Sequence, residues 1–282
     1  MADSSQTMTS VAQTSDLPNP DESGQSVYSR FTGSSIIRWL LAAIILILLW
    51  AIIAFISRST IMEVVDAFIR LATEGDSQGF LLIDHVAQSV FIVTVGFFVA
   101  AITAIPLGIA IGRYKVVDSI LGPVVEAMRP IPPIAWIPLS LLIFASLLYS
   151  QVFIIWVGAF FPILINTTTG VKRTEPVHVD VAKTFGASES KILSSVVIPS
   201  AAPEVFAGMR IGFGIGWMCL VAAEMIGSNK GLGYLIWTMQ QVGWTGAVIS
   251  SMLVIGLIGF AVSFLILMIE RRLLKWRQEV SV

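Results

Sequence analysis

Few residues in this sequence could carry out covalent chemistry. Cys219 is the single cysteine and lies in an apolar stretch, where a small core residue is expected. His85 and His178 stand apart along the chain, without the spacing of a metal-ligand cluster. Neither a Ser/His/Asp or Cys/His set nor a Gly-x-x-x-x-Gly-Lys-Ser/Thr segment for phosphates can be recognised. We therefore expect no catalytic residue, no metal site and no cofactor in this chain.

A second group of polar residues lies within or beside long apolar segments. A charge at the centre of a bilayer costs about 2.5–3.5 kcal/mol, so such residues need a partner or a function. They could snorkel to the interface or form ion pairs between helices. Alternatively, Arg129, Arg210 or Glu224 could line the path or gate of a solute. The group consists of Glu126, Arg129, Glu204, Arg210 and Glu224.

The elements that must position these residues are membrane spans. Of 282 residues, 56% are hydrophobic and 12% are charged, whereas soluble globular proteins contain about 25% charged residues. The formal net charge of -1 lacks the basic signature of nucleic-acid binding. Lipid cannot satisfy backbone hydrogen bonds, so each apolar segment must be helical. The composition predicts an all-α membrane protein.

Six segments are predicted to cross the bilayer, for which about 20 apolar residues each suffice. The uncharged run Pro130–Val171 is too long for one crossing and is expected to fold back near Tyr149–Gln151. A short surface helix is expected over residues 231–242. The six predicted transmembrane helices are residues 36–57, 87–112, 124–147, 151–170, 204–226 and 247–269.

The basic residues predict the orientation of these spans. With the N-terminus in the cytoplasm, the inner segments hold twelve Lys and Arg residues and the outer segments hold only Arg58, Arg70 and Lys230. This distribution satisfies the positive-inside rule. Residues 1–35 lack the apolar core of a cleaved signal and are predicted to be a disordered cytoplasmic tail. Residues 271–282 are predicted to be a second cytoplasmic tail.

Prolines interrupt the predicted third span. Pro130, Pro132, Pro133 and Pro138 cannot all lie inside a regular helix. Irregular backbone within a membrane is tolerated where it is buried in protein or faces water. The segment, with Pro133 and Trp136, could therefore line a pathway, although a proline-rich helix start at the interface fits equally well.

Glycines recur at four-residue spacing on two of the predicted spans. Such spacing lets helix backbones approach closely, either within a subunit or across a dimer. We therefore expect these glycines to serve helix packing. They are Gly108 and Gly112 on the second span, and Gly208, Gly212 and Gly216 on the fifth.

Residues 175–199, between the fourth and fifth spans, have the pattern of a helix, a glycine break, a second helix and a proline stop at Pro199. Gly186 can adopt a positive φ and end the first helix. Ser188 followed by Glu189 is typical of a helix N-terminus. Two short amphipathic helices suit docking into a groove of a partner, but a solvated connector lying on lipid headgroups would look the same.

The same loop resembles the EAA loop of ABC importer permeases. Asp180-Val181-Ala182 matches the first triplet, Gly186 matches the glycine, and Ile198-Pro199 matches the end of the motif without a gap. Arg129–Leu139 and Ala222–Gly233 resemble segments of the nitrate/sulfonate/taurine/bicarbonate importer permeases. The resemblance covers about residues 85–270, which would form a permease core with five transmembrane helices.

This resemblance implies the type I, MetI-like permease fold with a cytoplasmic coupling helix, in a prokaryotic cell membrane. A separate ATPase subunit would bind ATP and Mg, an external solute-binding protein would deliver the cargo, and a second permease copy in a homodimer would complete the pathway within the lipid. The solute would be a small anion such as nitrate, a sulfonate, taurine or bicarbonate. The residues implied at the ATPase contact are Asp180, Ala182, Gly186, Ala187, Ser188 and Pro199.

Two other classes of function remain possible from the sequence alone. An ion-coupled secondary transporter would need carboxylates near the middle of the membrane and an internal inverted repeat, neither of which is clear here. A membrane enzyme would need catalytic groups clustered on one membrane face, whereas a scaffold would show no stimulation of an ATPase by the solute.

Overall fold

The structure is a computed structural model that describes residues 40–41, 44–45, 48, 52 and 60–274. The predicted tail at 1–35, most of the predicted span at 36–57 and residues 275–282 lie outside the described residues. The six described residues of that span are all helical. The chain divides into two units, Met1–Arg58 and Ser59–Val282, and the second unit is described below.

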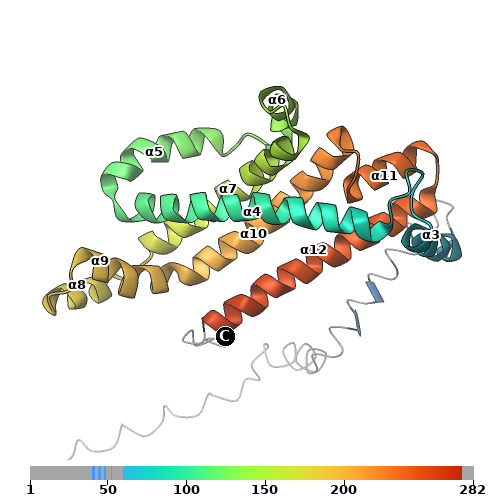
Figure 1. The fold of residues 1–282 in the computed structure, drawn as a ribbon. Coiled ribbons are helices and arrows are strands. Elements are labelled where there is room, and N and C mark those ends of the chain that lie inside the picture. The colour runs from blue at the N-terminus through green and yellow to red at the C-terminus, as the bar shows by residue number, and fades with distance from the viewer. Residues whose placement is uncertain (1–39, 42–43, 46–47, 49–51, 53–59, 275–282) are drawn as a thin grey trace, which may run out of the picture. The chain divides into compact units, whose positions relative to one another are not determined.

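Helices joined by short turns make up residues 60–274, and no strand occurs among them (Figure 1). In chain order the helices are α3 (Ile61–Thr73), α4 (Leu82–Arg113), α5 (Lys115–Met128), the 3₁₀ helix η1 (Pro133–Trp136), α6 (Ile137–Ile143), α7 (Leu147–Lys172), α8 (Pro176–Thr184), α9 (Glu189–Ile192), the π-helical turn η2 (Leu193–Val197), α10 (Ile198–Gly227), α11 (Leu232–Gln241) and α12 (Thr245–Leu273).

Within the described ranges, four helical segments are long and apolar enough to cross a membrane. They are α4, α7, the continuous segment Glu189–Gly227, and α12. These helices contain the predicted spans at 87–112, 151–170, 204–226 and 247–269. The predicted surface helix at 231–242 is α11.

The predicted span at 124–147 is wrong as a single helix. α5 ends at Met128, residues 129–132 form a turn, and only η1 and the short α6 follow before the chain reverses at Phe144–Ser146. The reason is the proline cluster at 130–133, whose residues lack N–H donors and whose rings clash with a preceding helical turn. The reversal also comes before the predicted position at residues 149–151.

α7 lies between α4 and α10, and glycines on both neighbours allow the close approach. A Cβ atom at Gly212 would lie 2.9 Å from the carbonyl oxygen of Ala159 on α7, and one at Gly108 would lie 2.8 Å from the Cβ of Thr167. Gly208 and Gly216 also face α7. These glycines thus lie at close helix contacts within this chain.

A helix that the sequence reading missed, α3, packs against α12. Thr60 and Glu63 form a capping box at its start, with the backbone N–H of Thr60 donating to Glu63 Oε2 at 3.2 Å. Val64, Ala67 and Leu71 are buried at helical spacing. Residues 58–86, expected only as an outer loop, thus contain an ordered amphipathic helix.

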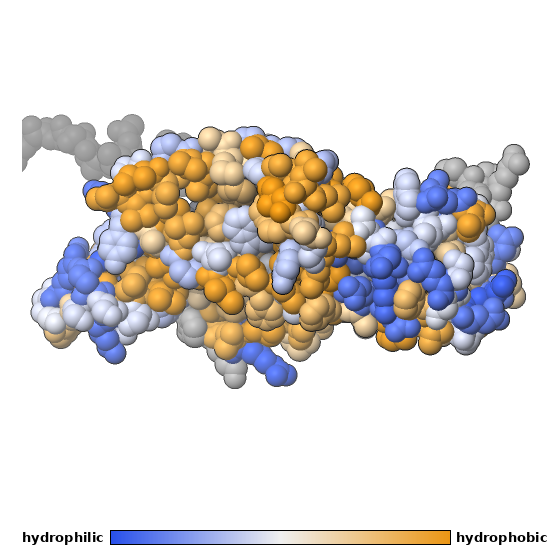
Figure 2. All heavy atoms as spheres, turned by 45° about the horizontal axis from the view of Figure 1, so that its top comes forward, coloured by the Kyte–Doolittle hydropathy of each residue, from blue (hydrophilic) through white to orange (hydrophobic). Residues whose placement is uncertain are grey.

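The surface of the second unit in Figure 2 is apolar in the middle and polar at both ends, as expected of a protein that spans a bilayer. Figure 2 shows apolar residues gathered over the middle of one face, and polar residues at the left, where α8 and α9 lie, and at the right, where α3 and α11 lie. Exposed side chains such as Phe98, Leu257 and Phe260 belong to the long helices. Apolar side chains on this scale are stable at a surface that contacts lipid or protein.

Candidate functional site

The loop between α7 and α10 has the local structure that its sequence predicts. α8 ends at Thr184, and Gly186 follows with a φ of +74°. Ser188 is the N-cap of α9, and its hydroxyl accepts a hydrogen bond from the backbone N–H of Lys191 at 3.4 Å. The predicted helix break and second helix start are both confirmed.

The predicted stop at Pro199 is wrong. The chain stays helical from Glu189 to Gly227, with Pro199 in the first turn of α10. The π-helical turn η2 precedes it, where the N–H of Ile198 donates to the carbonyl of Leu193, five residues back. The wider turn accommodates a proline that cannot donate to the preceding turn.

The loop has an inner and an outer face. Val179, Ala182 and Ala187 pack against a buried cluster formed by Val171, Ile192, Val197 and Ala201. Among the residues implied at an ATPase contact, Asp180, Gly186 and Ser188 are exposed, whereas Ala182, Ala187 and Pro199 are half-buried. Ala182 and Ala187 therefore support the loop from within.

The outer face of α8 carries an apolar row, which we call the coupling stripe. It consists of Val177, Val181 and Phe185, spaced by four residues, and the Phe185 side chain is 86% exposed. Residues four apart lie on the same side of a helix. The three side chains therefore form one surface on the side of α8 that does not pack on the body.

Ion pairs attach the loop to the neighbouring helices. Arg113, the last residue of α4, pairs with Glu189 of α9. Arg173, directly after α7, lies 3.7 Å from Glu204 of α10. Together with the buried cluster beneath the loop, these pairs connect α8 and α9 to all three helices of the central layer.

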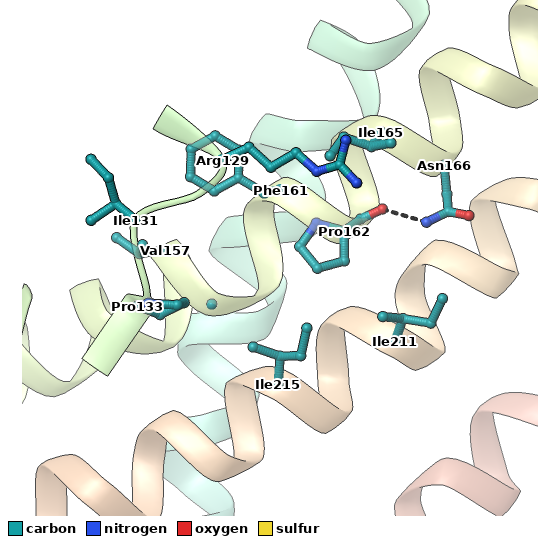
Figure 3. Close-up of a pocket in the computed structure, with 11 residues that line it drawn as sticks. Arg129, Ile131, Pro133, Val157, Phe161, Pro162, Ile165, Asn166, Ile211 and Ile215 are labelled. Atoms are coloured by element: carbon teal, nitrogen blue, oxygen red, sulfur yellow. Dashed lines mark hydrogen bonds between the residues drawn. The ribbon is translucent and has the colours of Figure 1, made fainter. Parts of the chain in front are cut away.

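A pocket of about 340 Å³ lies between the α5–η1 linker, α7 and α10 (Figure 3). Two of the predicted pathway residues, Arg129 and Pro133, line it. The Arg129 guanidinium points along the pocket toward Asn166, which donates a hydrogen bond to the carbonyl of Pro162 at 2.8 Å. Most of the remaining wall is apolar and includes Phe161, Ile211 and Ile215.

The other three predicted pathway residues lie elsewhere. Trp136 packs beside Phe153, with ring centroids 6.2 Å apart. Arg210 lies 3.4 Å from Glu270 of α12, which is the interhelical ion pair that the sequence left as an alternative. Glu224 is fully buried near the end of α10, away from the pocket.

Glu224 holds the start of α11. Its carboxyl group accepts hydrogen bonds from the Ser89 hydroxyl at 2.7 Å and from the backbone N–H of Gly233 at 2.8 Å. The Ser89 oxygen in turn accepts from the N–H of Leu232 at 2.9 Å. The two N–H groups belong to the first turn of α11, where a negatively polarised acceptor is favourable.

His85 is not isolated, in contrast to the sequence reading. Its Nε2 atom lies 3.4 Å from Asp76 Oδ2, and its Nδ1 atom lies 3.1 Å from both the N–H and the carbonyl of Gly231. Both side chains of the Asp76–His85 pair are buried. We call Asp76, His85, Ser89, Glu224 and Gly231 the far-end cluster, because it lies at the opposite end of α4 from Arg113.

Comparisons with known proteins place the chain in a family. The family model described as binding-protein-dependent transport system inner membrane component matches residues 104–275. The chain belongs to this family. It is a multi-pass membrane protein, and it is the membrane-spanning permease subunit of an ABC importer rather than a catalytic subunit.

Individual relatives agree with this assignment. A Methanocaldococcus jannaschii protein named as an ABC transporter permease is 43% identical over 238 residues, which cover 82% of this permease and 89% of the relative. The taurine transport system permease protein TauC of Escherichia coli is 35% identical over 75% of this permease and 78% of its own length. The nitrate import permease protein NrtB of Synechococcus elongatus is 35% identical over 64% of this permease and 65% of its own length.

A solved structure confirms the fold. The permease matches a chain of the MetNI methionine ABC transporter in an inward-facing conformation, with a TM-score of 0.56 and 20% identity. The match covers 69% of this permease and 94% of that chain. The type I, MetI-like fold predicted from the sequence is therefore confirmed, and membership of the transport family sets aside an ion-coupled secondary transporter.

Several residues of the loop surface, the pocket and the far-end cluster were missed by sequence reasoning. Val177 and Phe185 could have been found, because apolar side chains four residues apart, with polar residues between them, indicate a possible docking face. Asn166 and Ile211 of the pocket give no such signal, since they resemble ordinary residues of a span. Ser89, 135 residues away from Glu224 in sequence, becomes recognisable only in the folded chain.

Proposed function

We propose that this permease imports a small anion and that the coupling stripe docks into a groove of the ATPase subunit. The ATPase subunit binds ATP and Mg, and this chain needs no cofactor of its own. The observation that carries the proposal is an apolar row, Val177, Val181 and Phe185, that stays exposed while Val179 and Ala182 pack inward.

The chemistry of the stripe supports an occupant that is a protein. An amphipathic helix that docks in a groove uses anchors spaced by three or four residues, as these three side chains are. Large aromatic anchors carry a large share of binding energy at protein interfaces, and Phe185 occupies that role at the tip of the loop. Movement of the ATPase would reach α4, α7 and α10 through the ion pairs and the buried cluster.

The remaining partners follow from the same proposal. Two identical permease copies surround the pathway within the lipid, since one chain presents one coupling loop. An external or periplasmic binding protein delivers the solute at the far end, and both termini face the cytoplasm, as the distribution of basic residues suggests. Relatives named for taurine and nitrate support a solute that carries an anionic group.

Mutation of the coupling stripe tests the proposal. We expect Phe185→Ala to weaken binding of the ATPase subunit at least tenfold, a loss of about 1.4 kcal/mol or more, and to lower transport accordingly. The measurement is co-purification of the complex from membranes, followed by uptake in proteoliposomes. Because the side chain is exposed, the amount of permease in the membrane should not change.

The matched control is Lys183→Ala, which changes an exposed residue of the same helix outside the stripe and should leave binding within about twofold. Val181→Asp, which places a charge in the stripe, should also weaken binding of the ATPase subunit. If both Phe185→Ala and Val181→Asp bind the ATPase subunit as the wild type does, that subunit docks elsewhere and the proposal is wrong.

A further inference from the structure

We infer that the pocket beside Arg129 is a transient binding site for the anionic group of the solute, with the Arg129 guanidinium as the specificity-determining group. The inference rests on the proposed import of an anion and deepens it, because it assigns the recognition step to one residue. It starts from the pocket of about 340 Å³ between the α5–η1 linker, α7 and α10.

Arg129 is the one charged residue among those that line this pocket in the described part of the chain. Figure 3 shows its guanidinium lying along the pocket toward Asn166, and Ile211 and Ile215 of α10 form the opposite wall. Asn166 uses its amide N–H on the carbonyl of Pro162. The positive charge therefore faces a wall that is otherwise mainly apolar.

The Arg129 guanidinium is also available to a ligand. Its nearest carboxylate, Glu126, lies one turn back on the same chain segment at 3.9 Å, and the two side chains are 55% and 72% exposed. An exposed pair at this distance contributes little. Arg210, by contrast, lies 3.4 Å from a Glu270 side chain that is only 10% exposed. The structure thus separates the two arginines that the sequence left as equal candidates.

The chemistry of the pocket fits a small oxyanion. A guanidinium presents its N–H donors in a planar fork that matches the oxygens of a carboxylate or a similar group. An apolar environment strengthens such a charge-assisted bond, and it can also receive a short aliphatic part of the solute. Cavities of about 300–1,000 Å³ are typical of small-molecule sites.

A single cation on an otherwise apolar wall also suits a solute that must leave again. Passage through a membrane protein requires binding that is favourable enough for entry and weak enough for release. The pocket provides one guanidinium per permease copy, with no second basic residue among the described residues that line it. This arrangement gives selectivity for charge without tight retention.

Transport by the complete complex tests the inference. The permease, its ATPase and its binding protein are reconstituted in proteoliposomes, and ATP-driven uptake of labelled taurine, nitrate, bicarbonate and ethanesulfonate is measured. For the probe that the wild type transports, Arg129→Gln should lower uptake at least tenfold. Stimulation of the ATPase by the loaded binding protein should remain, because the coupling loop is untouched.

Two further variants separate charge from structure. Arg129→Lys keeps the positive charge and should retain at least a third of the wild-type uptake. Lys115→Gln removes one exposed positive charge from the start of α5, outside the pocket, and should leave uptake unchanged. Uptake by Arg129→Gln within twofold of the wild type overturns the inference, and so does an Arg129→Lys variant that is as inactive as Arg129→Gln.

If Arg129→Gln does not assemble, the opposite wall gives an independent test. Ile211→Asp places a carboxylate in the same pocket and should lower anion uptake at least tenfold relative to Ile211→Asn, and equal uptake by these two variants overturns the inference. A wild-type complex that transports none of the four probes contradicts the proposed anion import itself. If the wild type transports a probe and the Arg129→Gln variant transports it equally well, only the inference about Arg129 is wrong, and the proposed anion import stands.

Discussion

The two ends of α4 are built on opposite principles. At the coupling end, Arg113 pairs with an exposed Glu189, and the apolar coupling stripe faces outward. At the far end, His85, Ser89 and Glu224 are buried, and their polar atoms bind backbone groups of the Gly231–Gly233 turn.

If the coupling stripe docks as proposed, the two ends have different tasks. At the far end, Glu224 and Ser89 accept backbone hydrogen bonds within the chain, and His85 Nε2 lies 3.4 Å from Asp76, so this geometry depends on contacts of the chain with itself. At the coupling end, the apolar side chains of the coupling stripe are exposed. Replacing them should therefore weaken docking of a partner more than it weakens folding. Mutations should therefore affect folding at the far end and coupling at the other, and three predictions test that contrast.

The largest effect is expected at Gly186, where a substitution should abolish transport. We predict that Gly186→Glu uncouples the ATPase while the permease remains in the membrane. The glycine has a φ of +74°, and no described atom lies within 4 Å of the position that a Cβ would take, so backbone strain and charge rather than lack of space are the cause. Uptake and ATPase activity in proteoliposomes measure this.

Gly186→Asn is the matched variant, because asparagine tolerates the left-handed conformation better than other residues. It should retain most of the transport that Gly186→Glu loses. Normal solute uptake by the Gly186→Glu variant would contradict the role given to this loop.

The next effect is expected at Glu224, and here it should concern stability. Glu224→Ala leaves the Ser89 hydroxyl and the Gly233 N–H without their acceptor, and each buried unpaired group costs about 1–3 kcal/mol. We predict a loss of about 3 kcal/mol, measured as a lower Tm of the purified complex. Glu224→Gln, which keeps one acceptor oxygen, should lose less.

An exposed glutamate provides the control for this prediction. Glu74 is 65% exposed and pairs with Arg70 on the surface, so Glu74→Ala should change stability by less than about 0.5 kcal/mol. An equal Tm for Glu224→Ala and the wild type would mean that the far-end cluster does not stabilise the fold.

The smallest of the three effects is expected in the layer between the two ends. Gly212→Ala would bring a Cβ to 2.9 Å from both the Ala159 carbonyl oxygen and the Ile163 Cγ1 atom. Overpacking of this kind costs about 1–3 kcal/mol, and we predict about 2 kcal/mol by thermal unfolding. Gly214→Ala, whose Cβ would have no described atom within 4 Å, should be neutral or slightly stabilising. Equal losses in both variants would contradict the packing role of the glycine row.

Local chemistry explains which parts of the fold were predictable from sequence. Gly186 and Ser188 act on their own turn of the chain, so their roles follow from residue type and spacing. The long spans follow from their hydropathy alone. The start of α3 was also predictable, because Thr60 and Glu63 have the spacing of a capping box, although the polar residues around it indicated a loop.

Non-local contacts explain what was not predictable. His85 meets Gly231 across 146 residues, and no pattern along the chain signals that encounter. The proline cluster at 130–133 indicated irregular backbone but not where α6 would end. Arg129 and Arg210 have the same chemistry in sequence, and only the position of Glu270 distinguishes the paired residue from the available one.

The π-helical turn η2 has a geometric consequence for coupling. The bond from Ile198 N–H to the Leu193 carbonyl encloses one residue more than an α-helical turn does. Each residue of an α-helix rotates the chain by about 100°. Because η2 encloses its extra residue within one turn, deleting one residue between 193 and 197 should restore an α-helical turn and leave Phe185 close to its present angle around α10, whereas deleting one residue from the first α-helical turn of α10 would swing it by about a quarter turn. The π-helical turn therefore lets this segment gain or lose one residue without turning the exposed face of α8 away from its present direction.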